Sequence, residues 1–444
     1  MGLLHTVASF LVALGVLIVV HELGHYLVAR LCGVKVLRFS VGFGRPLATW
    51  RVGPDRTEWV VAAVPLGGYV KMVDEREGDV APADRPRAFN RQSVWRRIAI
   101  VAAGPVANFL LAILLYWWLF MSGVQEAKPI LAAPDPGTIA AEAGVARGDT
   151  IRAINGEPVA GSQEVRWRLL QLALDRKSAQ LEVVDARGTI DSRTLDLSRV
   201  STGDIEGDLL AKLGLKLELT RAVIGDVLAG SVAERAGLAL GDRVVAIGDQ
   251  PIETWGDFVT RVRASPGRPL VIDIQRGGER RRIELTPETA TEGGKSIGRI
   301  GAGSGAFYKV SYGPFEAATR AVAKTWEMSV FSLRMLGKMI VGEISWRNLS
   351  GPVTIADYAG QSASLGLAPY LSFLALISIS LGVLNLLPIP LLDGGHLMYY
   401  TIELLKGSPV SERVMELGQR AGLAVLLFLM AFAFYNDIHR LLSS

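Results

Sequence analysis

Hydrophobic residues are concentrated in four long stretches of the chain, at about residues 7–31, 98–121, 365–387 and 421–435. An α-helix rises 1.5 Å per residue, so about 20 consecutive apolar residues cross the hydrocarbon core of a bilayer. Between the second and third stretches, residues 123–364 mix polar and apolar positions. The pattern predicts a multi-pass α-helical membrane protein with four transmembrane helices and a large region outside the bilayer.

One segment of this outer region occurs twice. The string AAEAGVARGDTIRAINGEPV at residues 140–159 recurs as VAERAGLALGDRVVAIGDQPI at residues 232–252, with Asp149 and Asp242 at equivalent positions 93 residues apart. Each copy predicts a short helix that ends at a glycine, a Gly-Asp turn and a strand of alternating residues. A repeat unit of this size is a small domain.

The shared A-G-x-x-x-G-D pattern resembles the PDZ domains of bacterial envelope proteases, in their circularly permuted form. The resemblance implies two PDZ-like α+β domains, which we expect at residues 127–220 and 221–307. PDZ domains commonly bind peptides by adding a strand to a sheet edge. The alternative, that the two copies only pack and shield an entrance, stays open.

A hairpin is predicted within residues 1–122, between the first two membrane helices. Residues 47–70 alternate and turn at Gly53-Pro54-Asp55. The apolar strand Glu58–Val64 either dips into the membrane and pairs with an extended peptide, or only supports the fold.

A linker region is predicted at residues 314–350, before the last two membrane helices in residues 351–444. Within it, residues 319–344 combine helical apolar spacing with lysine and arginine. This predicts an amphipathic helix on the outer face of the membrane.

Composition excludes some functions. Half of the residues are hydrophobic and the mean hydropathy is +0.32, while the net charge of +4 is small for 444 residues. No basic stripe interleaved with aromatic residues occurs, so we expect no nucleic-acid partner. The single cysteine, Cys32, excludes a disulfide within the chain.

Basic residues predict the orientation in the membrane. The loop between the first two helices carries basic residues at both ends, namely Arg30, Lys35, Arg38, Arg91, Arg96 and Arg97. By the positive-inside rule this loop is cytoplasmic. The repeat region is therefore predicted to lie outside the cytoplasm.

The first apolar stretch contains an H-E-x-x-H motif, His21-Glu22-Leu23-Gly24-His25. Residues four apart on a helix share one face and lie about 6 Å apart along its axis, so both imidazoles can bind one metal ion. The glutamate is placed to accept a proton from a water that the metal activates. Ionisable residues inside a membrane helix are costly unless they are partnered, so their presence there indicates a functional site. The motif therefore predicts a catalytic zinc site, with Glu22 as the base.

A catalytic zinc site uses three protein ligands and keeps a fourth position for water. The sequence offers Asp393, in the string NLLPIPLLDGGH at residues 385–396, at the same predicted depth as the histidines. Prolines break the helix there, and Gly394-Gly395 permit close backbone approach. His396 is the alternative ligand, but it lies beyond two glycines, so Asp393 is favoured.

These motifs together resemble the site-2 protease family of intramembrane zinc metalloproteases. The resemblance covers nearly the whole chain. Besides the HELGH motif and the paired repeats, it is carried by the strings VGFGRPL, PLGGYVKM, AAGPVANF, NLSGPVTIA and LDGGHL.

The resemblance implies a site and a setting. It implies that His21, His25 and Asp393 bind one zinc per chain, that Glu22 activates water, and that Asn385 lies near the substrate backbone. It also implies a multi-pass protein of the bacterial inner membrane, with the PDZ-like domains on the periplasmic side. The implied partners are the lipid bilayer and single-span membrane proteins such as a pre-trimmed anti-sigma factor, with remnant signal peptides as a second substrate class.

Two other classes of function fit less well. A silent membrane scaffold predicts a damaged metal set, whereas the four residues of the expected site are intact. A metal transporter predicts polar residues spread across the bilayer and related membrane halves. Here the ionisable residues cluster at one predicted depth.

Overall fold

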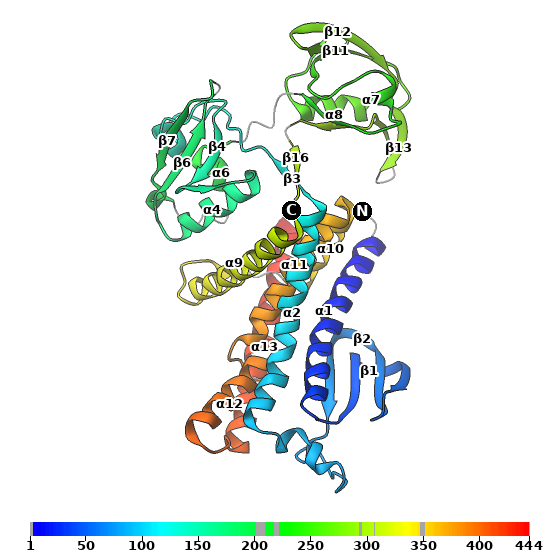
Figure 1. Ribbon diagram of the computed structural model, residues 1–444, viewed down its shortest axis with the longest axis vertical. Coiled ribbons are helices and arrows are strands. Elements are labelled where there is room, and N and C mark those ends of the chain that lie inside the picture. The colour runs from blue at the N-terminus through cyan, green and yellow to red at the C-terminus, as the bar shows by residue number, and fades with distance from the viewer. Residues whose placement is uncertain are drawn as a thin grey trace. The chain divides into compact units, whose positions relative to one another are not determined.

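The computed structural model describes residues 3–185, 187–200, 209–216, 222–292, 295–305, 307–346 and 351–443. The chain forms two compact units (Figure 1). One unit contains Met1–Ser122 and Tyr312–Ser444, and it is mainly helical. The other contains Gly123–Ser311, and it is mainly built of strands.

The helices of the first unit are α1 (Leu3–Leu31), α2 (Val94–Ser122), α9 (Pro314–Ile340), α10 (Pro352–Leu365), α11 (Leu367–Leu386), α12 (Asp393–Lys406) and α13 (Glu412–Ser443). Among the described residues, four helices are long and apolar enough to cross a membrane, namely α1, α2, α11 and α13. This confirms the four predicted stretches. The last helix starts at Glu412 rather than Ala421, because polar turns with an i,i+4 pair between Arg420 and Glu416 extend it.

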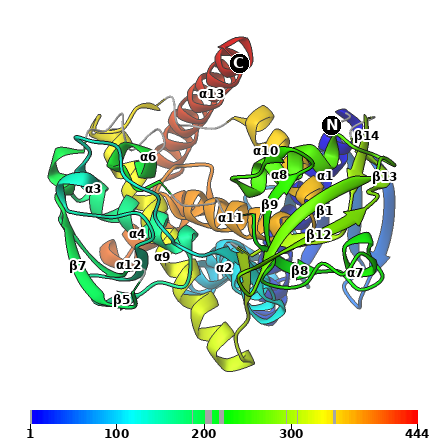
Figure 2. The same cartoon turned by 90° about the horizontal axis from the view of Figure 1, so that it is seen from above.

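Helix α2 is the centre of this unit, in contact with α1, α9, α11 and α12 (Figures 1 and 2). Small residues allow the closest approach, since a Cβ at Gly24 of α1 would overlap the backbone of Ala103 of α2. Leu17 of α1 packs with Leu374 of α11 in one buried cluster. This close contact places side chains of α2 beside the HELGH motif of α1.

Helix α9 corresponds to the amphipathic helix predicted at residues 319–344, although it begins and ends earlier. Its buried residues recur every four positions, at Ala317, Ala321, Thr325 and Ser329, and the helix contacts α2 and α11. Its exposed residues include Phe315, Val322 and Trp326.

The C-terminal helix is attached to α10 by one buried carboxylate. Asp437 of α13 accepts hydrogen bonds from the N–H groups of Gly351, Val353 and Thr354 and from the Thr354 hydroxyl. These N–H groups belong to the first turn of α10, which has no partner for them within the helix. Asp437 therefore caps α10 from another helix.

The predicted hairpin consists of β1 (Val36–Val52) and β2 (Thr57–Met72), and two short 3₁₀ helices, Arg85–Arg87 and Phe89–Arg91, follow it. The predicted turn at residues 53–55 is confirmed, but the strands extend beyond residues 47–70. The Arg87 guanidinium ties the turn to the following loop through two contacts of 2.6 Å with the Asp55 carboxylate.

Both strands of this hairpin are bent, so that β1 and β2 pair with each other over more than one segment. Glu58 pairs with both Arg38 and Arg51. The segment around Glu58 therefore has a neighbouring strand on each side. The predicted pairing of Glu58–Val64 with an extended peptide is wrong for this part of the strand, because its backbone groups are already used.

The second unit contains two four-stranded sheets with matching strand orders, β5-β4-β6-β7 and β10-β9-β11-β12. The first copy contains α3 (Ile139–Glu142), β4 (Thr150–Ile154), β5 (Glu157–Pro158), α4 (Ser162–Leu174), β6 (Ala179–Val184) and β7 (Ile190–Leu195). The second contains α7 (Val232–Arg235), β9 (Arg243–Ile247), β10 (Gln250–Pro251), α8 (Trp255–Arg263), β11 (Leu270–Arg276) and β12 (Glu279–Leu285).

The repeated aspartates have the same structural role in both copies. Asp149 accepts a hydrogen bond from the Ala146 N–H, and Asp242 accepts one from the Ala239 N–H. Both side chains are buried in the turn that precedes the strand. The repeat seen in the sequence is thus a repeat of structure, with a separate apolar core in each copy.

The remaining elements of the second unit are short: β3 (Val124–Ala127), the 3₁₀ helix Leu197–Arg199, α6 (Leu209–Leu213), β8 (Ile224–Val227), β13 (Glu288–Glu292), β14 (Lys295–Arg299), β15 (Ala302–Ser304) and β16 (Phe307–Val310). Strands β3 and β16 pair with each other, with Ala127 opposite Phe307. They are the two ends of the unit, where the chain enters from α2 and leaves toward α9.

Candidate metal centre

Both histidines of the HELGH motif point to one side of α1. Their Nε2 atoms are 3.3 Å apart, and their rings meet edge to face. The side chains of His21 and His25 are only 12% and 11% exposed. The four-residue spacing on a continuous helix is sufficient to produce this pair.

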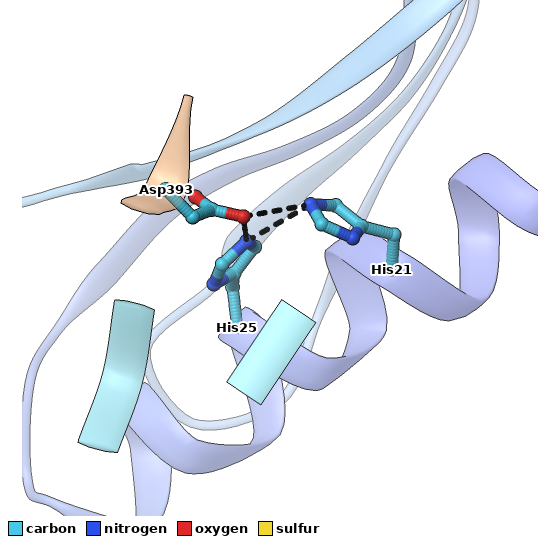
Figure 3. Close-up of side chains that lie close together, drawn as sticks. All are labelled: His21, His25 and Asp393. Carbon is cyan, nitrogen blue, oxygen red and sulfur yellow. Dashed lines mark hydrogen bonds and ion pairs between the residues drawn. The ribbon is translucent and has the colours of Figure 1, made fainter. Parts of the chain in front are cut away.

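Asp393 reaches the same point from the start of α12 (Figure 3). Its Oδ2 lies 3.2 Å from His21 Nε2 and 3.5 Å from His25 Nε2. Among the described residues, these three form the only group of histidine, cysteine or acidic side chains close enough to share a metal ion. The alternative ligand His396 lies outside this group, with its ring against Tyr399.

The three atoms fit zinc in kind and in spacing. Four ligands placed tetrahedrally at about 2.0–2.2 Å from zinc lie about 3.3–3.6 Å from one another. The three observed separations are 3.2, 3.3 and 3.5 Å. In addition, Asp393 Oδ2 is buried and accepts no well-aligned hydrogen bond from the described part of the chain. Two imidazoles and one carboxylate are a usual set for catalytic zinc.

Helix α2 supports both rings from behind. The Ile100 carbonyl oxygen lies 2.8 Å from His25 Nδ1, and the Asn108 amide nitrogen lies 3.1 Å from His21 Nδ1. Between them, a Cβ at Gly104 would overlap His25 Nε2 and lie 2.8 Å from His21 Cε1. Sequence reasoning did not identify these three positions. One signal was present, because Asn108 is a strongly polar residue within the apolar stretch at residues 98–121.

Glu22 lies on the hairpin side of α1. The residue is 8% exposed, and its carboxylate makes no hydrogen bond within the described residues. It packs against Gly68 of β2, where an added Cβ would lie 2.8 Å from Glu22 Cγ and 2.7 Å from the Ser40 carbonyl oxygen. Gly68 is a further position that sequence reasoning missed. Close packing fixes Glu22 while its carboxylate stays unpaired, as a proton acceptor requires.

Asn385 lies in the last turn of α11, before the loop that leads to Asp393. It is half-buried, and its amide makes no hydrogen bond within the described ranges. The loop between is tightly folded, with Leu391 at φ +99°. A Cβ at Gly395 would lie 2.5 Å from the Ile389 carbonyl oxygen, which explains the need for glycine two residues after Asp393.

Comparison with known proteins identifies the family of the chain. The model of peptidase family M50 matches residues 9–429. The chain belongs to this family. It is the site-2 protease family that the sequence resembles, and the chain is accordingly a zinc metalloprotease.

Relatives of this M50 protease are similar along their whole length. A protein of Ralstonia nicotianae that bears the name zinc metalloprotease is 46% identical, over 98% of each chain. The regulator of sigma-E protease RseP of Escherichia coli is 44% identical, over 99% of this chain and 100% of its own. The protein of the same name from Salmonella typhimurium is also 44% identical, with the same coverage.

One buried ion pair fixes the helix that carries Asp393 in this M50 protease. Arg97 of α2 donates to Glu403 of α12 at 2.7 Å, and its guanidinium lies over the Tyr400 ring. The two charged side chains are 10% and 12% exposed. The first turn of α2 and the C-terminal part of α12 are thereby held together, which positions α12 relative to the histidines.

Proposed function

We propose that this M50 protease hydrolyses a peptide bond in the membrane segment of single-span proteins of the bacterial inner membrane. The observation that carries the proposal is the cluster of His21, His25 and Asp393. The two histidines lie on α1, which is long and apolar enough to cross a membrane, and Glu22 beside them makes no hydrogen bond within the described residues. The regulator of sigma-E relatives support an anti-sigma factor as substrate, trimmed beforehand outside the membrane. Remnant signal peptides are a second proposed class.

The proposed site holds one zinc ion on His21, His25 and Asp393. When bound, zinc polarises the scissile carbonyl and makes water a nucleophile near neutral pH. Glu22 accepts the proton of the attacking water and passes it to the leaving amide nitrogen. Asn385, whose amide makes no hydrogen bond within the described residues, bonds to the substrate backbone and keeps it extended. The packing of Gly68 against Glu22 holds the base in place.

A substrate helix must unwind before it can be cut. Its carbonyl groups are bonded to N–H groups four residues along, so neither the zinc nor a nucleophile can reach them. Glycine and proline in a substrate segment lower the cost of unwinding by about 1 to 3 kcal/mol per residue. We therefore propose that cleavage favours membrane segments that contain such residues.

The two repeats are proposed to be PDZ-like domains on the periplasmic side, acting mainly as a size filter for substrates. Matching strand orders in the two copies support a duplicated domain. The basic residues around the loop at residues 32–97 support the orientation. Peptide binding by these domains is secondary in this proposal.

Cleavage of a membrane peptide by the protease reconstituted in lipid vesicles tests the proposal. Glu22→Gln should retain zinc and lose cleavage by at least about a hundredfold, since an amide cannot accept the proton. The matched control is Glu316→Gln, the same change at an exposed position on α9, which should cut normally. Near-normal cleavage by Glu22→Gln would refute the assigned base.

A further inference from the structure

Asn108 is a completely buried polar side chain of α2 that the mechanism does not yet use. Its amide faces His21, with Nδ2 at 3.1 Å from the ring Nδ1. Its Oδ1 is buried and has no hydrogen-bond partner among the described residues. Buried polar groups are usually hydrogen-bonded, so an amide whose nitrogen has a partner and whose oxygen has none needs an explanation.

The reason lies in the proton of the His21 ring. A neutral imidazole carries one proton, on Nδ1 or on Nε2, and the partner of one nitrogen decides the form. For His25, a backbone carbonyl fixes the position of the ring proton. Its Nδ1–H donates to the Ile100 carbonyl oxygen, which leaves Nε2 with a free lone pair. For His21, no backbone carbonyl of the described residues bonds to Nδ1, and the Asn108 amide lies there instead. Asn108 occupies the equivalent place, two helical turns farther along α2.

Only one orientation of the amide suits metal binding. If Nδ2 donates to Nδ1, the ring proton is on Nε2, where it blocks the lone pair that a metal needs. If Oδ1 faces the ring, Nδ1–H donates to it and Nε2 is free. Rotation of the amide exchanges an unpaired buried oxygen for an unpaired buried nitrogen, so the number of unpaired groups stays the same. Binding of zinc by His21 Nε2 would then favour the orientation in which Oδ1 faces the ring.

We infer that Asn108 is a positioning residue of the metal centre: in the zinc-bound protease its Oδ1 accepts a hydrogen bond from His21 Nδ1–H and fixes the ring with Nε2 toward the metal. This inference rests on the proposed ligation of zinc by His21. Outer partners of this kind typically change metal affinity by about 10- to 100-fold. Ile100, Gly104 and Asn108 thus serve both histidines from one stripe of α2.

The test measures zinc affinity rather than cleavage, by competition with a chromophoric chelator on full-length protein purified in detergent. Asn108→Leu keeps the shape of the side chain and removes the acceptor, so zinc should bind about 10- to 100-fold more weakly. Asn108→Asp keeps the acceptor and has no N–H to donate, so its affinity should stay within a few-fold of the wild type.

The control is Ser378→Ala. The Ser378 hydroxyl donates to the Asn108 backbone carbonyl at 2.7 Å, so this change disturbs the same buried contact of α2 with α11 but leaves the amide untouched. It should bind zinc as the wild type does. Wild-type affinity in Asn108→Leu would overturn the inference, and so would an Asn108→Asp protein as weak as Asn108→Leu. If Asn108→Leu does not fold, as judged by thermal unfolding of the zinc-free protein, the Asn108→Asp result alone decides between acceptor and donor.

Different results would refute the zinc ligands and the positioning role of Asn108. Unchanged zinc affinity in His21→Ala would refute the ligand set itself. Loss of affinity in His21→Ala together with wild-type affinity in Asn108→Leu would refute only the positioning role.

Discussion

At the scale of single residues, the candidate metal centre depends on a glycine that leaves room for both histidine rings. Gly104 of α2 lies against both histidine rings, and any Cβ there would overlap His25 Nε2. The ring cannot move away easily, because the Ile100 carbonyl holds its other nitrogen at 2.8 Å. Glycine is usually disfavoured inside a helix by about 1 kcal/mol. Here the steric clash that glycine avoids costs more free energy than its low helix propensity.

We therefore expect Gly104→Ala to bind zinc at least about tenfold more weakly, as the loss of support around a ligand typically does. Overpacking should also destabilise the fold by about 1–3 kcal/mol. Metal analysis after dialysis against a weak chelator measures the first effect. Gly15→Ala is the matched control, since Gly15 also lies inside a membrane-length helix and a Cβ there meets nothing within 4 Å. Equal zinc content in both variants would contradict the expected crowding.

At the scale of elements, the position of α12 determines whether Asp393, the proposed third ligand, reaches the histidines. Asp393 is the first residue of α12, and the loop before it is short. The buried pair of Arg97 with Glu403 attaches this helix to α2. A buried charge that loses its partner is costly, whereas replacement of both charges by apolar groups is often neutral.

The expected result is thus different for single and double substitutions. Glu403→Ala should destabilise the protein by about 3–5 kcal/mol, because the Arg97 guanidinium stays buried without its partner. Arg97→Met with Glu403→Met should be clearly more stable than Glu403→Ala. Thermal unfolding in detergent compares them, with Arg420→Met plus Glu416→Met as an exposed pair for reference. A double variant as unstable as the single one would mean that the pair itself, and not the unpaired charge, carries the stability.

At the scale of the whole molecule, the second unit is joined to the membrane helices by the paired strands β3 and β16. Ala127 lies opposite Phe307 in this pair. Residues 128–306 can therefore be replaced by Asn-Gly, the usual two-residue connection of a hairpin, without opening the pair. This removes both repeats and keeps the predicted amphipathic helix α9.

If the repeats act as a size filter, this deletion should allow cleavage of an untrimmed substrate and change the cleavage of a trimmed one by less than about threefold. A tether predicts the reverse, with poorer cleavage of the trimmed substrate and no gain on the long one. Both rates are measured on the same reconstituted protein. The variant that also carries Glu22→Gln shows whether any new cleavage comes from this site. Loss of trimmed-substrate cleavage with normal zinc content would rule out the filter as the main role.

Local pattern by itself determined much of this protein. Apolar length fixes the four membrane-length helices, because a helix satisfies its own backbone groups and needs only enough residues to cross. The spacing of His21 and His25 fixes their common side, since four residues make about one helical turn. The aspartates of the two repeats were visible because each serves a turn only three residues away. All of these are interactions between near neighbours in the chain.

Tertiary structure decided the rest, because contacts between distant segments leave no periodic trace in a sequence. Asp393 was expected from its motif and a family resemblance, but only the folding of α12 against α2 brings its Oδ2 to 3.2 Å from His21 Nε2. The sequence shows Asn108 as a polar residue in an apolar stretch, but only the close packing of α1 on α2 makes Asn108 and Gly104 neighbours of the histidines. The strand at Glu58 likewise gained a second partner only when the hairpin bent back on itself. Helical spacing set which side chains share a face, and packing alone set which faces meet.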